Sequence, residues 1–306
     1  MKINFFTTPP LTPRLFTTLV AALLLFTGCM TGDDSKTTEY KLSFSANGGS
    51  GTIASISVEE GSEIELPENT FTKTGYSFAG WATSADGNVS YSDKAKISIT
   101  GNITLYAKWT VVAENAVNAI NSLPTGEHKI AVTGQMTKDN LNGVIAAIKD
   151  NSNGAKVYLD LGGITVDFYD WIKCSFKECE NLIGIVIPSI EPPPDNESQY
   201  ILIPDLMFEG CKNLKSVIIL NSSGEYKIIT FKDCTSLEYV EIPTSIVCIY
   251  GDAFDGCTAL ETITYKGTVE QWKQVKTDYK KENYKLMSLN VQCENGTASG
   301  SDLIKE

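Results

Sequence analysis

The second half of this 306-residue chain repeats one short unit of Phe, Cys and Leu four times. In each copy the Cys stands three residues after the Phe, and the Leu stands three residues after the Cys. β-Branched or aromatic residues follow that Leu at its third and fifth positions. The copies occupy residues 176–188, 208–220, 231–243 and 254–266, and the last two steps are 23 residues each. The first step is longer because a Pro-rich insertion, residues 191–199, follows the first copy.

A period in the twenties with this apolar spacing predicts a solenoid of stacked parallel strands. The two apolar residues after each Leu are two positions apart, so they point to the same face of a short strand. One copy cannot bury that face alone, whereas stacked copies build a continuous core. The inward residues are then Ile185, Ile187, Val217, Ile219, Val240, Ile242, Ile263 and Tyr265, and the opposite wall is filled by Phe176, Phe208, Phe231 and Phe254.

The repeated cysteines, Cys179, Cys211, Cys234 and Cys257, are interpreted as a ladder of small buried thiols. In an exported protein, disulfides would be favoured. However, the Cα–Cβ bonds of stacked residues are parallel, which leaves their Cβ atoms further apart than the roughly 3.8 Å that a disulfide prefers. A metal cluster is a weaker alternative, because the chain has no Cys-x-x-Cys and a single His. Disulfides and metal stay open as alternatives, as does pairing among the remaining cysteines Cys174, Cys248 and Cys293.

The string F-x-x-C-x-x-L-x-x-I-x-I-P resembles the BspA-type leucine-rich repeats of bacterial surface proteins. The resemblance assigns residues 171–266 to the repeats and residues 267–306 to a C-terminal cap and tail. Trp272 and Val275 lie on one turn, which predicts an amphipathic helix covering the open core of the last repeat.

Residues 115–170 are interpreted as the N-terminal cap of the solenoid. Leu141, Ile145 and Ile148 have helical spacing, and the stretch from Thr137 is a plausible helix start. Residues 156–163 then predict a strand with alternate apolar positions on one face.

Residues 40–110 contain no cysteine and predict a small, mostly β domain with an aromatic core. The segment begins with alternating apolar and polar residues, and this alternation ends in a turn signal at residues 47–49. A second turn signal lies at residues 84–88. The expected core aromatics are Tyr76, Phe78, Trp81, Tyr106 and Trp109. Together with the glycines around them they resemble the Listeria–Bacteroides repeat, the internalin-type B repeat, which implies a β-grasp-like fold without catalysis. A carbohydrate-stacking platform is the alternative role for these aromatics.

The first 28 residues are interpreted as an export signal. Lys2 and Arg14 precede a short apolar run at residues 15–26, and Gly28 stands directly before Cys29. This arrangement resembles the lipobox of bacterial lipoproteins, which implies lipidation of Cys29. Residues 29–39 are polar and serve as a tether. The lipid would then attach the protein to its membrane partner, since no segment has the roughly 20 apolar residues of a spanning helix.

Neither the charge nor the motifs indicate an enzyme or a nucleic-acid binder. The formal charge of −12 argues against binding a phosphate backbone. His128, the single His, is expected at the surface of a connecting stretch, so a Ser or Cys triad lacks a base. We find no nucleotide, cofactor or metal motif, and a hydrolase of envelope polymers would need a clustered acidic or His site that is not evident. We therefore expect a non-catalytic protein without cofactor.

The predicted fold is mainly β with some α: a small β-grasp-like domain followed by a leucine-rich-repeat solenoid with parallel strands. Outward positions of that solenoid form the candidate ligand face, which comprises Val186, Ile218, Glu241, Thr264 and Tyr239. Val186 and Ile218 are expected to be exposed apolar neighbours, which can mark a contact site. Local strand propensity, or cover by residues 191–199, is the alternative explanation for these two apolar residues.

The resemblances imply a lipid-anchored cell-envelope protein, exposed on the outer membrane, that binds extracellular protein or glycan ligands in adhesion or host interaction. The alternative is a periplasm-facing lipoprotein with a structural or envelope-assembly role.

Overall fold

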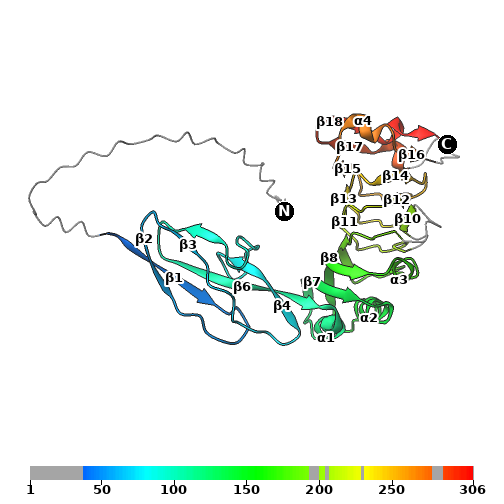
Figure 1. The fold of residues 1–306 in the computed structure, drawn as a ribbon. Helices are drawn as coiled ribbons and strands as arrows, with labels where there is room; N and C mark the ends of the chain where they lie inside the picture. The colour runs from blue at the N-terminus through cyan, green and yellow to red at the C-terminus, as the bar shows by residue number, and fades with distance from the viewer. Residues whose placement is uncertain (1–36, 193–199, 204–206, 229–230, 278–284, 306) are drawn as a thin grey trace, which may run out of the picture. The chain divides into compact units, whose positions relative to one another are not determined.

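The computed structural model describes residues 37–192, 200–203, 207–228, 231–277 and 285–305 (Figure 1). The predicted signal, Cys29 and most of the predicted tether lie outside these residues. Within the described part of the chain, the helices are all too short or too polar to cross a bilayer.

The first described segment is built from six strands, and between Glu39 and Val112 the described residues form no helix. The strands are β1 (Glu39–Ser45), β2 (Ile56–Glu59), β3 (Glu63–Glu65), β4 (Tyr76–Ala82), β5 (Lys96–Ser98) and β6 (Ile103–Val112). Strand β1 runs parallel to β6 and antiparallel to β2, while β4 is antiparallel to β6. Strands β3 and β5 form a separate antiparallel pair.

Trp81 is the centre of the first core and is fully buried. The rings of Phe44, Phe71 and Phe78 contact it edge-on, with centroid distances of 5.2, 6.0 and 4.9 Å. Phe78 and Trp81 are three residues apart, and both face this core because the register of β4 against β6 shifts between Phe78 and Gly80.

The predicted aromatic core is confirmed for Phe78, Trp81 and Trp109, which all belong to this first cluster. The prediction is wrong for Tyr76, which packs against the core of the solenoid instead. Tyr106 is half-buried and lies between Leu105 and Ala107, whose side chains fill the first core. Alternation along β6 therefore directs Tyr106 to the other face.

The next segment contains two helices and two long parallel strands. Its elements are η1 (Ala113–Asn115), α1 (Ala116–Asn121), β7 (Gly126–Met136), α2 (Lys138–Lys149), β8 (Ala155–Val166) and α3 (Phe168–Trp171). Helix α2 begins as predicted, because the Thr137 hydroxyl accepts the Asn140 N–H at 3.2 Å. His128 lies within β7 rather than in a connection, and its Nε2 is 2.8 Å from the Pro124 carbonyl oxygen.

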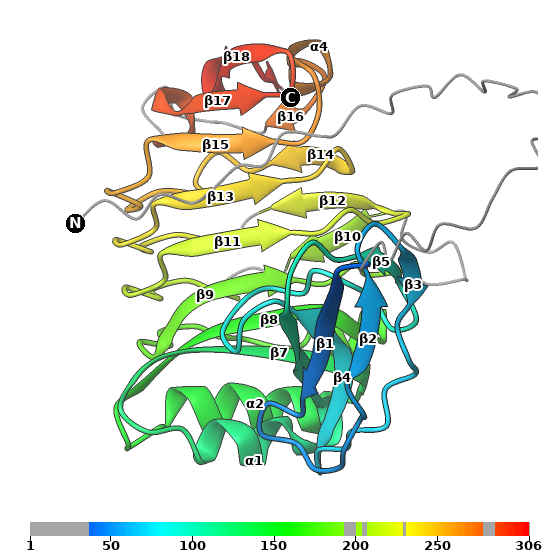
Figure 2. The same cartoon turned by 90° about the vertical axis from the view of Figure 1, so that its left-hand side faces the viewer.

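The repeats contribute one strand each to a parallel sheet, as predicted. These strands are β9 (Leu182–Ile187), β11 (Ser216–Ile219), β13 (Tyr239–Ile242) and β15 (Thr262–Tyr265), followed by β17 (Asn290–Cys293) and the antiparallel β18 (Gly296–Ser299). We call β7, β8 and these six strands the main sheet. Figure 2 shows its repeat strands side by side.

A second parallel sheet, which the repeat pattern did not predict, faces the main sheet across the core (Figure 1). It consists of β10 (Tyr200–Ile203), β12 (Glu225–Ile228), β14 (Ile246–Ile249), β16 (Lys276–Thr277) and β19 (Ile304–Lys305). Its inward residues include Tyr226 and Ile249, both fully buried. The opposite wall is therefore made of strands as well as of the four phenylalanines.

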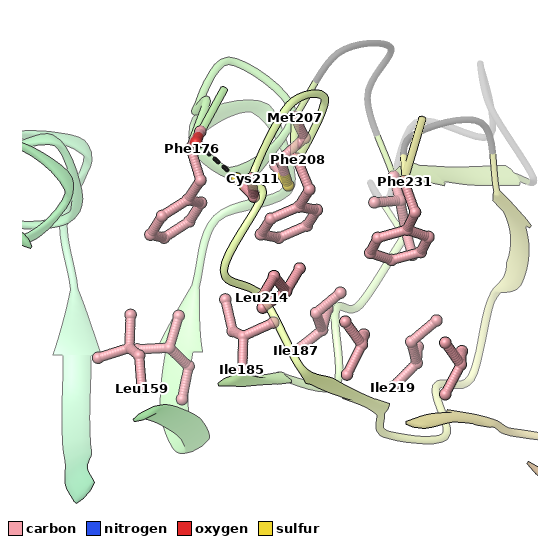
Figure 3. Close-up of a cluster of buried hydrophobic side chains, with 14 of the residues drawn as sticks. Leu159, Phe176, Ile185, Ile187, Met207, Phe208, Cys211, Leu214, Ile219 and Phe231 are labelled. Atoms are coloured by element: carbon pink, nitrogen blue, oxygen red, sulfur yellow. Dashed lines mark hydrogen bonds between the residues drawn. The ribbon is translucent and has the colours of Figure 1, made fainter. Parts of the chain in front are cut away.

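The phenylalanines and cysteines form two parallel ladders inside the solenoid. Figure 3 shows Phe176, Phe208 and Phe231 in a row, with Cys211 beside them. The four Phe rings stack with centroid distances of 5.3, 5.5 and 5.7 Å. Cys179, Cys211, Cys234 and Cys257 are fully buried as free thiols, which confirms the predicted ladder of buried thiols.

The turn between each Phe and its Cys uses one left-handed residue. This position has a φ of 57° at Glu178, 72° at Gly210, 58° at Asp233 and 78° at Gly256. Two of the four are glycine, the residue that adopts this conformation at least cost. The turn therefore bends the backbone in the same way in every copy.

The C-terminal end is closed by α4 (Val269–Trp272), η2 (Lys285–Ser288) and η3 (Gly300–Asp302). Trp272 is fully buried and contacts the ring of Tyr265 edge-on at 5.3 Å. Its indole N–H donates to the Ser299 carbonyl oxygen at 2.9 Å. The predicted helix over the last repeat is therefore present, although it is only one turn long.

Candidate ligand-binding face

The predicted ligand residues lie on one surface, the side of the main sheet that points away from the core. We call this surface the outer face. Register places Val186 beside Ile218, Ile218 beside Glu241, and Glu241 beside Thr264. Tyr239 lies one step along in the neighbouring row, beside Ser216. The structure therefore extends the two rows in both directions, to Tyr158 and Asp160 on β8 and to Asn290 and Gln292 on β17.

The expectation that Val186 is exposed is wrong, because only 8% of this residue is accessible. A Cβ atom added to Gly162 would lie 3.1 Å from Leu220 Cδ1 and 3.5 Å from Val186 Cγ1. The two aliphatic side chains thus both lie against this glycine, in space that a side chain at position 162 would need. Ile218 is half-buried. The alternative, in which residues 191–199 cover Val186 and Ile218, concerns residues that lie largely outside the described part of the chain.

Tyr239 is the exposed aromatic side chain of the outer face, with 39% of the residue accessible. Its hydroxyl donates to Glu241 Oε2 at 2.7 Å, and Lys266 Nζ lies 3.4 Å from the same oxygen. Burial, together with the hydrogen bond to Glu241, raises the pKa of Tyr239 to about 12. The phenol is therefore neutral near pH 7, and its hydroxyl retains the proton of the hydrogen bond to Glu241.

Tyr158 lies against Gly184 on the same face. A Cβ atom at position 184 would come within 2.2 Å of Tyr158 Cδ2, so the ring occupies the space that a side chain there would need. Lys129 Nζ is 5.3 Å from the centroid of this ring and 3.4 Å from Asp160 Oδ2. Burial raises the pKa of Tyr158, and the charges of Asp160 and Glu241 add to the shift. Tyr158 was not among the predicted ligand residues, although its position in the alternating pattern of β8 was visible in the sequence.

The outer face has an apolar half and a polar half. Val186, Ile218 and Leu220 form the apolar half, over β9 and β11. The polar half lies over β15 and β17 and consists of Thr262, Thr264, Asn290 and Gln292. Tyr239 and Glu241, on β13, stand at the boundary between the two halves.

A groove of about 530 Å³ lies on the other side of the solenoid, over the second sheet. Its lining includes Lys227, Cys248 and Lys276, which share one row across β12, β14 and β16. No pattern noted in the sequence predicted this groove. Over the residues that the structure describes, no three His, Cys, Asp or Glu side chains gather in a way that could hold a metal ion.

Comparison with known families identifies both repeat types. Residues 40–108 match the model of the Listeria-Bacteroides repeat domain. Residues 172–277 match the BspA type leucine rich repeat region in six copies, two more than the four Phe-Cys-Leu units. The chain carries both repeats. These repeat families are typically non-catalytic.

No curated protein matches the chain. Among solved structures, a leucine rich cell surface protein from Faecalibacterium prausnitzii A2-165 aligns with 25% sequence identity and a TM-score of 0.33. The alignment covers 52% of this chain and 37% of that protein.

Proposed function

We propose that this protein is a non-catalytic, lipid-anchored protein of the cell envelope that binds extracellular protein or glycan ligands through the outer face of its solenoid. The observation that carries the proposal is the continuous outer face itself, where register aligns side chains from β8 to β17 and leaves Tyr239 exposed. Solenoids commonly use such extended surfaces for recognition.

The anchor in this proposal is Cys29, which follows an apolar run and a small residue. Two or more acyl chains on one residue hold a protein firmly on a bilayer, whereas a single chain binds marginally. The Listeria-Bacteroides repeat would then act as a spacer or auxiliary module between the anchor and the solenoid. The adhesive role and the outer-membrane location are parts of the same proposal.

Binding is tested with the chain from residue 30 onward, captured on immobilised extracellular-matrix proteins and on isolated bacterial surface material. The variant Ile218→Glu places a carboxylate beside Glu241 in the adjacent strand and should weaken capture at least tenfold. Ile304→Glu is the matched control, because Ile304 is 41% exposed on the second sheet. Equal capture by both variants and the wild type would remove the outer face as the binding surface.

Location is tested by treating intact cells with a protease that cannot cross the outer membrane. Cleavage of the wild-type protein is expected, and Cys29→Ser should move the protein from the membrane fraction to the soluble fraction. A protein that is protected in intact cells and cut only after lysis would favour the periplasm-facing alternative.

A further inference from the structure

The ring of Tyr239 is held in one orientation on the outer face. Tyr239 and Glu241 are two residues apart on β13 and therefore point to the same side of the sheet. The hydrogen bond of 2.7 Å between them fixes the phenol hydroxyl against Glu241, while 39% of the residue stays accessible to solvent. Lys266 pairs with the same Glu241 carboxylate that accepts the hydrogen bond of Tyr239. An aromatic ring fixed before binding loses little conformational entropy when a ligand packs on it.

The surface beside this ring offers uncharged hydrogen-bonding groups. Thr264 is the partner of Glu241 in the next strand, and Gln292 is the partner of Thr264 in the strand after that. Thr262 and Asn290 form the adjacent pair, and both are exposed. Hydroxyl and amide groups both donate and accept hydrogen bonds.

The charges on this surface are balanced. Asp160 is paired with Lys129, and Glu241 is paired with Lys266. The chain as a whole carries a formal charge of −12. The negative charge of the molecule would therefore repel a polyanion, and the paired charges of this surface would not offset that repulsion. An uncharged ligand is not repelled.

We propose that the polar half of the outer face, with Tyr239, binds a neutral glycan. The apolar face of a sugar ring packs on the Tyr239 ring, while its hydroxyl groups bond to Glu241 and Thr264. Asn290 and Gln292 receive the next sugar along the row. A sugar ring has both an apolar face and a polar edge, which matches a surface that changes from aromatic to hydroxyl and amide groups across three neighbouring strands. This inference rests on the proposed function and names its ligand class.

The test uses affinity electrophoresis of the chain from residue 30 onward in native gels that contain one polysaccharide each. Soluble β-glucan and mannan are the neutral probes, and polygalacturonate is the anionic probe. We expect at least one neutral probe to retard the wild type, and polygalacturonate not to do so. Tyr239→Ala should weaken the retarding interaction about tenfold or more, and Thr264→Val, which keeps the shape but removes the hydroxyl, several-fold.

Tyr169→Ala is the matched control, because Tyr169 is 40% exposed on α3, away from the outer face. It should migrate like the wild type in every gel, and thermal melting of each variant verifies folding. Absence of retardation by both neutral probes, or equal retardation of wild type and folded Tyr239→Ala, would overturn the inference. If matrix-protein capture still depended on Ile218 in that case, the proposed function would stand with a protein as its ligand. If capture were also absent, both proposals would fall.

Discussion

At the scale of single residues, the structure explains why cysteine occupies the repeated position. The Phe176 carbonyl oxygen accepts the backbone N–H of Cys179 at 2.9 Å and the thiol of Cys211 at 3.0 Å. The next two copies repeat this arrangement, with thiol distances of 3.1 and 2.9 Å. A cysteine is small, largely apolar and able to donate weakly, so it fills the slot and also links each copy to the preceding one.

We expect Cys234→Ala to lower the free energy of unfolding by about 1–2 kcal/mol, because it removes a buried hydrogen bond to Phe208 and the volume of one sulfur atom. Cys234→Ser keeps a donor and should cost less than the alanine variant. Urea denaturation followed by circular dichroism measures both. A serine variant as unstable as the alanine variant, or more so, would show that the hydrogen bond contributes nothing.

The same burial predicts instability in alkali. Burial raises the pKa of Cys211 from its ordinary value of 9.0 to about 12. Between these values the unfolded chain releases a proton that the folded chain retains, so stability falls as pH rises, by about 1.4 kcal/mol per pH unit for one such thiol. Below pH 9 both states are protonated and this contribution is constant.

Urea midpoints measured from pH 8 to pH 11 check this expectation. They should stay level up to about pH 9 and then decline. The slope should be shallower in Cys211→Ala than in the wild type, and a flat profile through pH 11 would contradict a buried, protonated thiol.

At the scale of elements, a solenoid needs closed ends. Each repeat contacts only its neighbours, so the last one exposes its core unless another element covers it. Here α4 fills that role, and it is held by a capping box in which Thr268 and Gln271 bond to each other's backbone N–H groups. Trp272 supplies the apolar cover.

Trp272→Ala should therefore cost about 3–5 kcal/mol, the usual range for removing a buried aromatic side chain. Because stability in a solenoid depends on nearest neighbours, the loss should begin at the C-terminal end. Hydrogen exchange should show β17 and β15 losing protection first and β9 last. Uniform loss of protection across all repeat strands would argue against this neighbour-by-neighbour picture.

At the scale of the whole molecule, two separate hydrophobic clusters are joined by one strand. Leu105 and Ala107 of β6 belong to the first cluster, whereas Val111 belongs to the solenoid core. Val111 and Val112 also pair with β7. Strand β6 therefore passes from one core into the other without an intervening linker.

Separate cores predict separate cooperative units. Trp81→Ala should destabilise the first cluster by about 3–5 kcal/mol. It should leave amide protection in β11, β13 and β15 close to that of the wild type. Hydrogen exchange read by mass spectrometry resolves the two regions, and equal loss in both would mean that the chain unfolds as one unit.

The local pattern of the sequence determined the solenoid, its buried thiols and the start of α2, because each follows from spacing within one copy or from a cap next to its helix. The second sheet escaped prediction, since strands of four residues such as β12 and β14 carry too few alternations to identify alone. They also lie outside the Phe-Cys-Leu units, whose repetition identified the equally short β11, β13 and β15. The burial of Val186 and the placement of Tyr158 over Gly184 also required the tertiary structure. Both depend on contacts between residues of different strands, and the register that brings those residues together forms only when β8 and the repeat strands pair in the sheet.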